Sequence, residues 1–292
     1  MIKNSDGVPL TIDAALKLGA ARFQAAGLEL PQLDARLLLQ SVMGMEHSDL
    51  ISANERQLND QQIATFNEFI EQRLKRQPVN RIVGEKQFWG LTLKTSDAVL
   101  DPRADTECLV EAVINSLDLQ GRRNDVLRIV DIGTGSGAII LALLSELPSA
   151  VAVATDISSD ALKIARFNAE KLGYSSRISF QQGSYFESLS GLFDVIISNP
   201  PYISTIDIAM LEPEVREYDP TIALDGGVDG FDAYRCLLSE SGNFLTDDGM
   251  VFFEIGFDQA EAITTMANES GWRNVKILKD YGQNDRVFIA SR

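Results

Sequence analysis

The chain has 292 residues, of which 45% are hydrophobic and 23% charged, a composition ordinary for a folded globular protein of about two domains. Its net charge of −16 and its scattered basic residues offer no basic stripe to a phosphate backbone, which argues against direct binding of DNA. No apolar run approaches the ~20 residues that span a bilayer, and the first residues lack the apolar core of a signal peptide, so we expect a cytoplasmic protein without a membrane segment.

Residues 1–77 predict a small all-helical domain. Apolar residues recur there at the three- and four-residue spacing of helices that bury one face. Capping residues at the start, and glycine or proline at the end, set the limits of three helices. These limits are Thr11 and Gly27, Pro31 and Gly44, and Asn59 and Pro78. Residues 1–75 carry no catalytic pattern, so we expect no chemistry from this part.

Residues 78–98 predict a β-hairpin that links this domain to the rest of the chain. Ile82 and Val83 fit one strand and residues 88–93 fit the other, with residues 84–86 as the turn. We therefore expect a helical domain at 1–77, a hairpin linker at 78–98 and an α/β domain at 99–292.

The remaining sequence alternates between helices and short apolar strands. Strands are expected at residues 127–132, 151–155, 177–181, 193–199, 250–255, 275–278 and 286–289. Amphipathic helices lie before the first strand and between most of the others, which predicts a mostly parallel sheet covered on both faces. The last two strands are joined too tightly for a parallel crossover, so we expect the last strand to be a reversed, antiparallel edge strand.

The fourth strand ends in a polar turn, Asn199-Pro200-Pro201-Tyr202. The prolines cannot donate ladder hydrogen bonds, so Asn199 is the last residue whose side chain a rigid strand can aim. Its carboxamide offers an acceptor and two donors, the Pro200 carbonyl is a further acceptor, and the Tyr202 ring can pack on a flat group. The turn therefore suits a planar amino group, although Asn-Pro alone would merely end a strand.

This turn resembles the motif of amino-group methyltransferases that use S-adenosylmethionine (SAM) and act on adenine, cytosine or glutamine nitrogens. The resemblance implies a Rossmann-like, doubly wound sheet with one reversed edge strand.

The sequence has one histidine, His47, and two cysteines, Cys108 and Cys236. They provide neither a Cys/His zinc site nor a histidine-activated nucleophile, so we expect no metal.

A glycine-rich loop after the first strand predicts the cofactor site. Glycines let the backbone approach a ligand closely, and the N-terminus of the next helix faces the same space. The spacing also fits dinucleotide-binding loops, so an NAD-dependent oxidoreductase is an alternative. Asp131, just before the loop, favours SAM, because a carboxylate there would repel a pyrophosphate but suits the ammonium and sulfonium charges of SAM. The residues concerned are Asp131, Gly133, Thr134, Gly135, Ser136 and Gly137.

Two later strand ends extend the predicted cofactor site. Asp156 ends the second strand, where a carboxylate can accept hydrogen bonds from both ribose hydroxyls. Ile157 follows it and can pack on adenine. Tyr185 follows the third strand and can stack on the same ring.

The whole chain resembles the release-factor glutamine methyltransferases, the HemK/PrmC family. The resemblance includes motifs in the hairpin, the turn before the second domain, the glycine loop, the proline turn and two later loops. These motifs are residues 78–84, 88–90, 102–107, 133–137, 199–202, 224–230 and 280–286. The chain departs from the family pattern at Asp101, Ala104 and Tyr185, which bears on one turn and on adenine stacking.

The resemblance implies that SAM methylates the side-chain amide nitrogen of the glutamine in the Gly-Gly-Gln loop of class I peptide chain release factors. Asn199, which also borders the cofactor, and the Pro200 carbonyl would hold that amide, with Pro201 and Tyr202 beside it. The helical domain would recognise the release factor.

Three alternatives remain open. A ribosomal-protein glutamine methyltransferase would share the turn but have a different N-terminal domain. A DNA adenine methyltransferase is disfavoured by the acidic charge. A non-catalytic SAM-binding module is disfavoured by the intact Asn199 and loop glycines.

Overall fold

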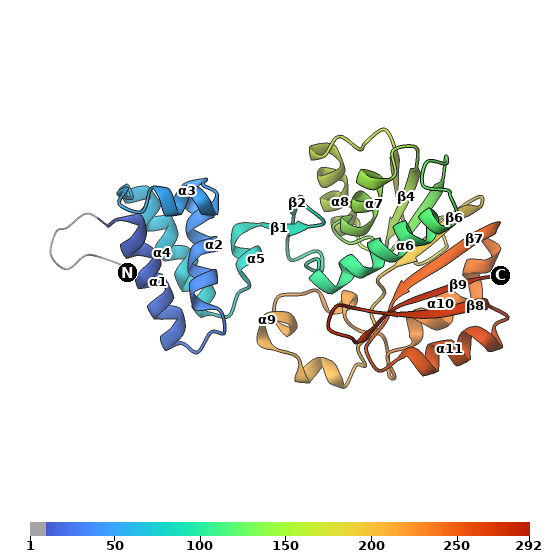
Figure 1. The fold of residues 1–292 in the computed structure, drawn as a ribbon. Coiled ribbons are helices and arrows are strands. Elements are labelled where there is room, and N and C mark those ends of the chain that lie inside the picture. Colours follow the sequence, from blue (N-terminus) through green and yellow to red (C-terminus); the bar gives the residue numbers. More distant parts are fainter. Residues whose placement is uncertain (1–9) are drawn as a thin grey trace. The chain divides into compact units, whose positions relative to one another are not determined.

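A computed structural model describes residues 10–292 of the chain. They form two compact units, one that ends at Gly84 and one that begins at Glu85 (Figure 1). Each unit has its own hydrophobic core. Within residues 10–292, no helix is long and apolar enough to cross a membrane.

The first unit is helical, as predicted. Thr11 caps its first helix by accepting a hydrogen bond from the Ala14 backbone, and Asn59 forms a capping box with Gln62 at the start of the fourth. The sequence did not indicate the third and fifth helices, which are short. The helices of residues 10–84 are α1 Ile12–Ala25, α2 Pro31–Met43, α3 His47–Ser52, α4 Asp60–Leu74 and α5 Val79–Val83.

The predicted hairpin is present, but its predicted turn at residues 84–86 is wrong. Residues 82 and 83 belong to α5, which ends at Gly84 in a left-handed conformation (φ 80°). The strands are β1 Glu85–Phe88 and β2 Leu91–Lys94. Their turn is Trp89-Gly90, a two-residue turn in which both residues have positive φ (51° and 71°). The sequence did not indicate this turn, because the apolar Trp89 is typical of a strand.

A seven-stranded sheet with the order β5-β4-β3-β6-β7-β9-β8 forms the centre of the second unit. The first five strands along the chain are parallel, and the last is antiparallel to both of its neighbours, as predicted. The last strand is not at the edge, however, because the crossover through α11 leaves a gap beside β7 that β9 fills. The strands are β3 Arg128–Ile132, β4 Val151–Asp156, β5 Ile178–Gln182, β6 Phe193–Ser198, β7 Leu245–Glu254, β8 Arg273–Lys279 and β9 Asp285–Ser291.

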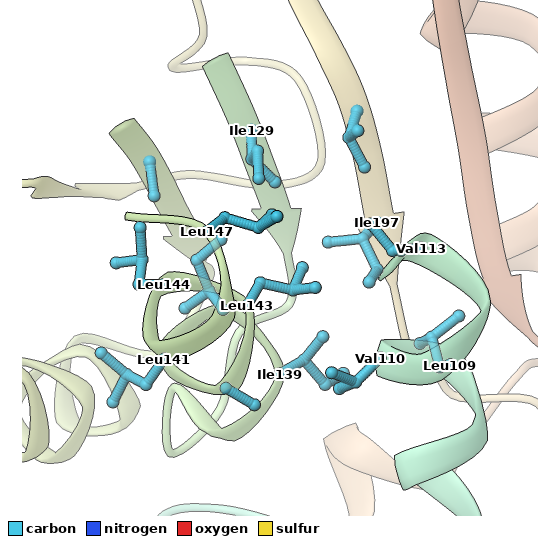
Figure 2. Packing of buried hydrophobic residues seen from close by; sticks show 14 of the residues in the cluster. Leu109, Val110, Val113, Ile129, Ile139, Leu141, Leu143, Leu144, Leu147 and Ile197 are labelled. Carbon is cyan, nitrogen blue, oxygen red and sulfur yellow. The ribbon is translucent and has the colours of Figure 1, made fainter. Parts of the chain in front are cut away.

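Helices cover both faces of this sheet, because its central strands are apolar on both sides. Ile129 and Ile197 pack with helices α6, α7 and α8 in one cluster, part of which is shown in Figure 2. Val130 and Ile196 point to the opposite face and pack with α10 and α11. The covering helices are α6 Glu107–Leu119, α7 Ala138–Glu146, α8 Ser159–Lys171, α10 Asp232–Glu240 and α11 Ala260–Glu269.

A long insertion between β6 and α10 returns to the proline turn. Ile203 and Asp225 form an isolated parallel bridge, so the end of the insertion lies beside the residues that follow β6. Asp219 of the insertion also accepts a hydrogen bond from Arg103 (2.6 Å), in the turn that precedes α6. The insertion contains α9 Pro213–Arg216 and the 3-10 turns η2 Asp207–Met210 and η3 Thr221–Ala223; η1 Ala104–Thr106 precedes α6, and η4 Ser241–Asn243 follows α10.

Candidate active site

A cavity of about 280 Å³ lies at the carboxyl ends of the parallel strands, the usual ligand edge of a doubly wound sheet. The turn before α6 and the end of the insertion complete its wall. The cavity brings together ten of the residues that the sequence indicated: Gly133, Thr134, Gly135, Ser136, Asp156, Ile157, Tyr185, Asn199, Pro200 and Pro201. Asp131, Gly137 and Tyr202 do not line it.

The glycine loop has the conformation expected of a ligand-binding loop. Gly133, Gly135 and Gly137 have positive φ values of 72°, 56° and 81°. No atom lies within 4 Å of the position that a Cβ would take on Gly133 or Gly135, so these two glycines leave open space beside the backbone. A Cβ on Gly137 would meet Leu141 and Ala165, so this glycine packs the loop against α7 and α8.

Asp131 lies beneath the loop. Its side chain is fully buried, and its Oδ2 accepts a hydrogen bond from the Thr134 hydroxyl at 2.7 Å. Its Oδ1 has no hydrogen-bond partner among the described residues. Burial is the main reason that the pKa of Asp131 rises to about 7; the Thr134 hydrogen bond opposes this rise, and the nearby charge of Asp156 contributes to it. Asp131 therefore holds the loop from below, and its contact with a ligand stays a prediction.

Asp156 joins the glycine loop to the start of α8. Its two oxygens accept hydrogen bonds from the Gly135 and Ser158 backbone amides, at 2.9 and 2.8 Å. The helix cap is supplied by the Ser158 hydroxyl, which accepts from Ala161. Burial raises the pKa of Asp156, and the two amides act against that rise. The carboxylate thus lies at the cavity wall with one lone pair on each oxygen already engaged.

Ile157 and Tyr185 supply the apolar part of the same wall. Ile157 is 53% exposed and lines the cavity, so its apolar side chain is open to a ligand there. Tyr185 has a φ of 45°, a strained value for an aromatic residue, so the turn after β5 holds it in a costly conformation.

Asn199 lies where two cavities meet. It lines the 280 Å³ cavity and also a second cavity of about 180 Å³, as does Pro200. Its Nδ2 donates to the Thr106 hydroxyl at 3.3 Å. The end of β6 therefore places the Asn199 carboxamide at the boundary between the larger and the smaller cavity.

Tyr202 lines only the second cavity. Its hydroxyl donates to Oε1 of Glu254 at 3.5 Å, and its backbone oxygen accepts from Nε2 of Gln259 at 3.0 Å. Burial, and then the charge of Glu254, raises the pKa of Tyr202 to about 12. Tyr202 therefore keeps its proton at neutral pH.

Sequence reasoning did not identify four residues that build this region: Arg103, Thr106, Glu254 and Gln259. Arg103 and Thr106 belong to a motif already noted in the family resemblance, but nothing in the chain order indicates that this motif meets Asn199. Glu254 could have been found from the strand pattern, because it ends β7 next to the end of β6. Gln259 gives no sequence signal of its own.

Comparison with known proteins covers both units. Residues 14–84 match the PrmC N-terminal domain, and residues 123–250 match a methyltransferase domain. The chain is 43% identical to the release factor glutamine methyltransferase of Agrobacterium fabrum over 99% of this chain and 100% of that one. It is 40% identical to that of Moorella thermoacetica, over 97% and 99% of the two chains. The chain belongs to the release factor glutamine methyltransferase family.

Membership in the release factor glutamine methyltransferase family makes this chain a methyltransferase and excludes the NAD-dependent oxidoreductase. The fold is also found in the crystal structure of the hMettl16 catalytic domain, with a TM-score of 0.57 and 17% identity over 70% of this chain and 76% of that one. Among residues 10–292 no group of histidine, cysteine, aspartate and glutamate side chains could hold a metal ion.

Proposed function

We propose that this enzyme transfers a methyl group from SAM to the side-chain amide nitrogen of the glutamine in the Gly-Gly-Gln loop of class I release factors, in the cytoplasm. The observation that carries the proposal is the position of Asn199 and Pro200, which line both cavities. A carboxamide side chain that enters from the smaller cavity would meet the cofactor cavity at these two residues.

The larger cavity fits SAM. Gly133 and Gly135 leave open space beside their backbone, Asp156 offers free lone pairs at the end of β4, and Ile157 exposes an apolar surface. In this arrangement Asp156 accepts from the ribose hydroxyls, while Ile157 and Tyr185 contact adenine. SAM supplies an electrophilic methyl group on a sulfonium.

The proline turn orients the target amide. Asn199 Oδ1 and the Pro200 carbonyl accept the two N–H bonds of the glutamine, so that the nitrogen faces the cofactor cavity. These acceptors also favour the positive charge that develops on the nitrogen as its lone pair leaves conjugation with the carbonyl. Pro201 and Tyr202 pack against the flat amide. Orientation of this kind can lower a barrier by ~7–11 kcal/mol, so the nitrogen needs no general base for its attack. The methylated nitrogen then releases its extra proton to water.

The remaining alternatives differ in substrate. A ribosomal-protein glutamine methyltransferase would use the same turn, but the match of residues 14–84 to the PrmC N-terminal domain supports a release factor. The net charge of −16 disfavours DNA as a substrate.

Asn199→Ala tests the proposal. We expect kcat on an intact release factor to fall by roughly 10²–10³-fold, as when an oxyanion-hole donor is lost, with little change in SAM affinity. Transfer of label from methyl-labelled SAM gives the rate, and calorimetry gives the affinity. Asn124→Ala, at an exposed position, is the matched control and should behave as wild type.

Two results would contradict the proposal. A near-normal single-turnover rate in Asn199→Ala would show that Asn199 only ends the strand and takes no part in the reaction. Preferential labelling of ribosomal protein or DNA over the release factor would assign the wild-type enzyme to another substrate.

A further inference from the structure

Gln259 is a buried glutamine beside the proline turn. It is the N-cap residue of α11 and is only 6% exposed. Its backbone N–H donates to the Gly256 oxygen at 3.0 Å, and its own backbone oxygen accepts from the Ile263 amide at 3.0 Å. Ile263 is fully buried in the core that covers one face of the sheet. The backbone of Gln259 is therefore anchored to the core through α11.

The Gln259 carboxamide makes three hydrogen bonds, all of them to backbone groups. Its Oε1 accepts from the Gly256 N–H at 2.9 Å. Its Nε2 donates to the carbonyl oxygens of Tyr202 and Gly230, at 3.0 and 3.2 Å. An amide nitrogen has two protons to donate, and each has an acceptor here. The side chain thus ties together the proline turn, the end of the insertion and the turn before α11.

These partners determine which way the carboxamide points. A flipped amide would turn its NH₂ group toward the Gly256 N–H and its oxygen toward two carbonyl oxygens. All three contacts would then be repulsive, and a buried polar group without a partner is costly. The donors of Gln259 are therefore held toward Tyr202 and Gly230.

Two glycines allow the carboxamide to lie this close to the backbone. A Cβ on Gly230 would lie 2.6 Å from the Tyr202 oxygen and 3.0 Å from Nε2 of Gln259. A Cβ on Gly256 would lie 2.8 Å from Oε1 of the same side chain. A larger residue at either position would push the carboxamide or the Tyr202 carbonyl away. The end of the motif at residues 224–230 thus leaves the room that this hydrogen bond needs.

The proline turn offers few backbone groups by which it can be held. Pro200 and Pro201 have no N–H, so neither can donate a hydrogen bond. The carbonyl of Tyr202 is the last acceptor of the turn, and it is the group that Gln259 binds. The Tyr202 side chain lines the smaller cavity, so a shift of its backbone would move its ring there and the two prolines before it.

We propose that Gln259 is a positioning residue that acts through the Tyr202 carbonyl to hold the proline turn in the conformation that receives the target glutamine. The inference rests on the proposed function of this turn, in which Asn199 and Pro200 orient the amide. It adds an anchor in α11 to the strand that leads into the turn.

Gln259→Met tests the anchor, because methionine has a similar length but no donor. We expect the single-turnover rate on an intact release factor to fall about tenfold to hundredfold, as when an orienting group is slightly misplaced. SAM affinity should stay near the wild-type value, since neither Gln259 nor Tyr202 lines the larger cavity. KM for the release factor should also change little, so that the loss lies in kcat. Transfer of label from methyl-labelled SAM gives the rates, and calorimetry gives the affinity.

Gln259→Glu separates the donors from the acceptor. Glutamate has the same shape and keeps an oxygen for the Gly256 N–H, but an ionised carboxylate has no donor for the Tyr202 carbonyl. At alkaline pH the rate should therefore fall in this variant as well. A normal rate in Gln259→Glu would contradict the inference, because it would show that the bond to Tyr202 is not needed.

Trp272→Phe is the matched control. Trp272 is also buried, and its Nε1 donates to the Leu238 oxygen at 2.8 Å, but it lines neither cavity. Loss of this bond should lower the free energy of unfolding and leave kcat unchanged. Urea unfolding of each variant shows that the rates belong to folded protein. A merely structural role for Gln259 would give Gln259→Met the same pattern as this control.

The wild-type enzyme provides a test that needs no variant. Both Nε2 protons of Gln259 are bonded within the protein, so their exchange with solvent, followed by NMR, should be far slower than that of the exposed Gln32 side chain. Equally fast exchange of the two side chains would show that the bonds to Tyr202 and Gly230 are not maintained.

Either that exchange result or a normal single-turnover rate in folded Gln259→Met would overturn the inference. Asn199→Ala separates it from the proposed function. If Asn199→Ala is active, the proposed function of the turn fails. If Asn199→Ala is inactive while Gln259→Met has a normal rate, only the anchor fails.

Discussion

Three buried or half-buried carboxyl groups support the two cavities, and each does so differently. Asp131 accepts a hydrogen bond from Thr134 beneath the glycine loop, Asp156 accepts from backbone amides at the wall, and Glu254 accepts from the Tyr202 hydroxyl behind the proline turn. Burial raises the pKa of all three. The ionisation of these three carboxyl groups therefore makes the free energy of unfolding depend on pH.

The pH dependence of stability should change in Asp131→Asn. The folded state holds the Asp131 proton up to a pKa of about 7, whereas the unfolded chain releases it near the ordinary aspartate pKa of 3.8. The bound Asp131 proton stabilises the folded state; this stabilisation is complete at low pH and is lost as the pH rises through about 7. Between these limits it reduces the free energy of unfolding by up to ~1.4 kcal/mol per pH unit. Asparagine carries no such proton, so the variant should gain stability relative to wild type as the pH rises from ~5 to ~6.5.

Urea unfolding at several pH values measures this difference. The titration of Glu254 is common to both proteins and cancels from the comparison. Asp247→Asn, at an exposed site, is the control and should follow wild type at every pH. A constant difference between Asp131→Asn and wild type would show that the Asp131 carboxyl is ionised throughout.

Asp156→Asn should weaken SAM binding. The amide retains one acceptor atom, so it cannot serve the Gly135 amide, the Ser158 amide and two ribose hydroxyls together. A lost hydrogen bond to a charged acceptor predicts a penalty of ~1.5–3 kcal/mol in calorimetric affinity. Asp160→Asn, on the exposed first turn of α8, should bind SAM as wild type does. Equal affinity in both variants would remove Asp156 from the cofactor site.

Single residues at strand ends were predictable, but their partners were not. Asn199 and Asp156 follow apolar strands, so the sequence alone indicates which edge of the sheet they occupy. Thr106 meets Asn199 across 93 positions of the chain, and no local pattern encodes that contact. The burial of Asp131 was likewise not predicted, because an aspartate near the end of a strand is far more often exposed than buried.

At the level of elements, periodicity and caps gave the helices and strands but not their register or lateral order. Trp89 hid the hairpin turn because an apolar aromatic residue is typical of a strand. The position of β9 between β7 and β8 was hidden because a short connection fixes only that two strands are antiparallel. Short helices such as α3 have too few turns to show a periodic pattern.

The insertion supports the proline turn through Gly226. A Cβ at this position would lie 2.9 Å from the Pro201 oxygen and 2.9 Å from the Tyr202 Cα, so the backbone itself would have to move. We expect Gly226→Ala to lower kcat by displacing the turn, with little effect on SAM affinity. Gly242→Ala is the matched control, because the three atoms nearest to a Cβ there all belong to the flexible end of the Arg292 side chain. A Gly226→Ala variant with normal kcat would show that the turn tolerates the shift.

At the scale of the molecule, the two units have separate cores, and the described cavities are lined by residues of the second unit alone. A short glutamine loop offers little surface for choosing one protein among many. We therefore propose that the helical domain supplies further contacts to the release factor. The sequence indicated this division, since no catalytic pattern occurs before residue 76.

A chain that begins at Glu85 tests this division of labour. It should bind SAM normally but lose much of its kcat/KM on intact release factor, while its slow reaction with a Gly-Gly-Gln peptide should change less. Circular dichroism checks that the shortened chain folds. Equal losses on peptide and protein would mean that the helical domain serves catalysis or stability rather than recognition.

The position of β9 has a consequence for the folding of the chain during its synthesis on the ribosome. Strands β3 to β7 emerge first and can pair in parallel as they appear, but the free side of β7 stays open until residues 285–291 arrive. In the sheet β8 pairs only with β9, so β8 cannot join the sheet before β9 has been synthesised. The nascent chain therefore exposes an apolar strand edge, the kind of surface that invites association with other chains, until its last strand is made.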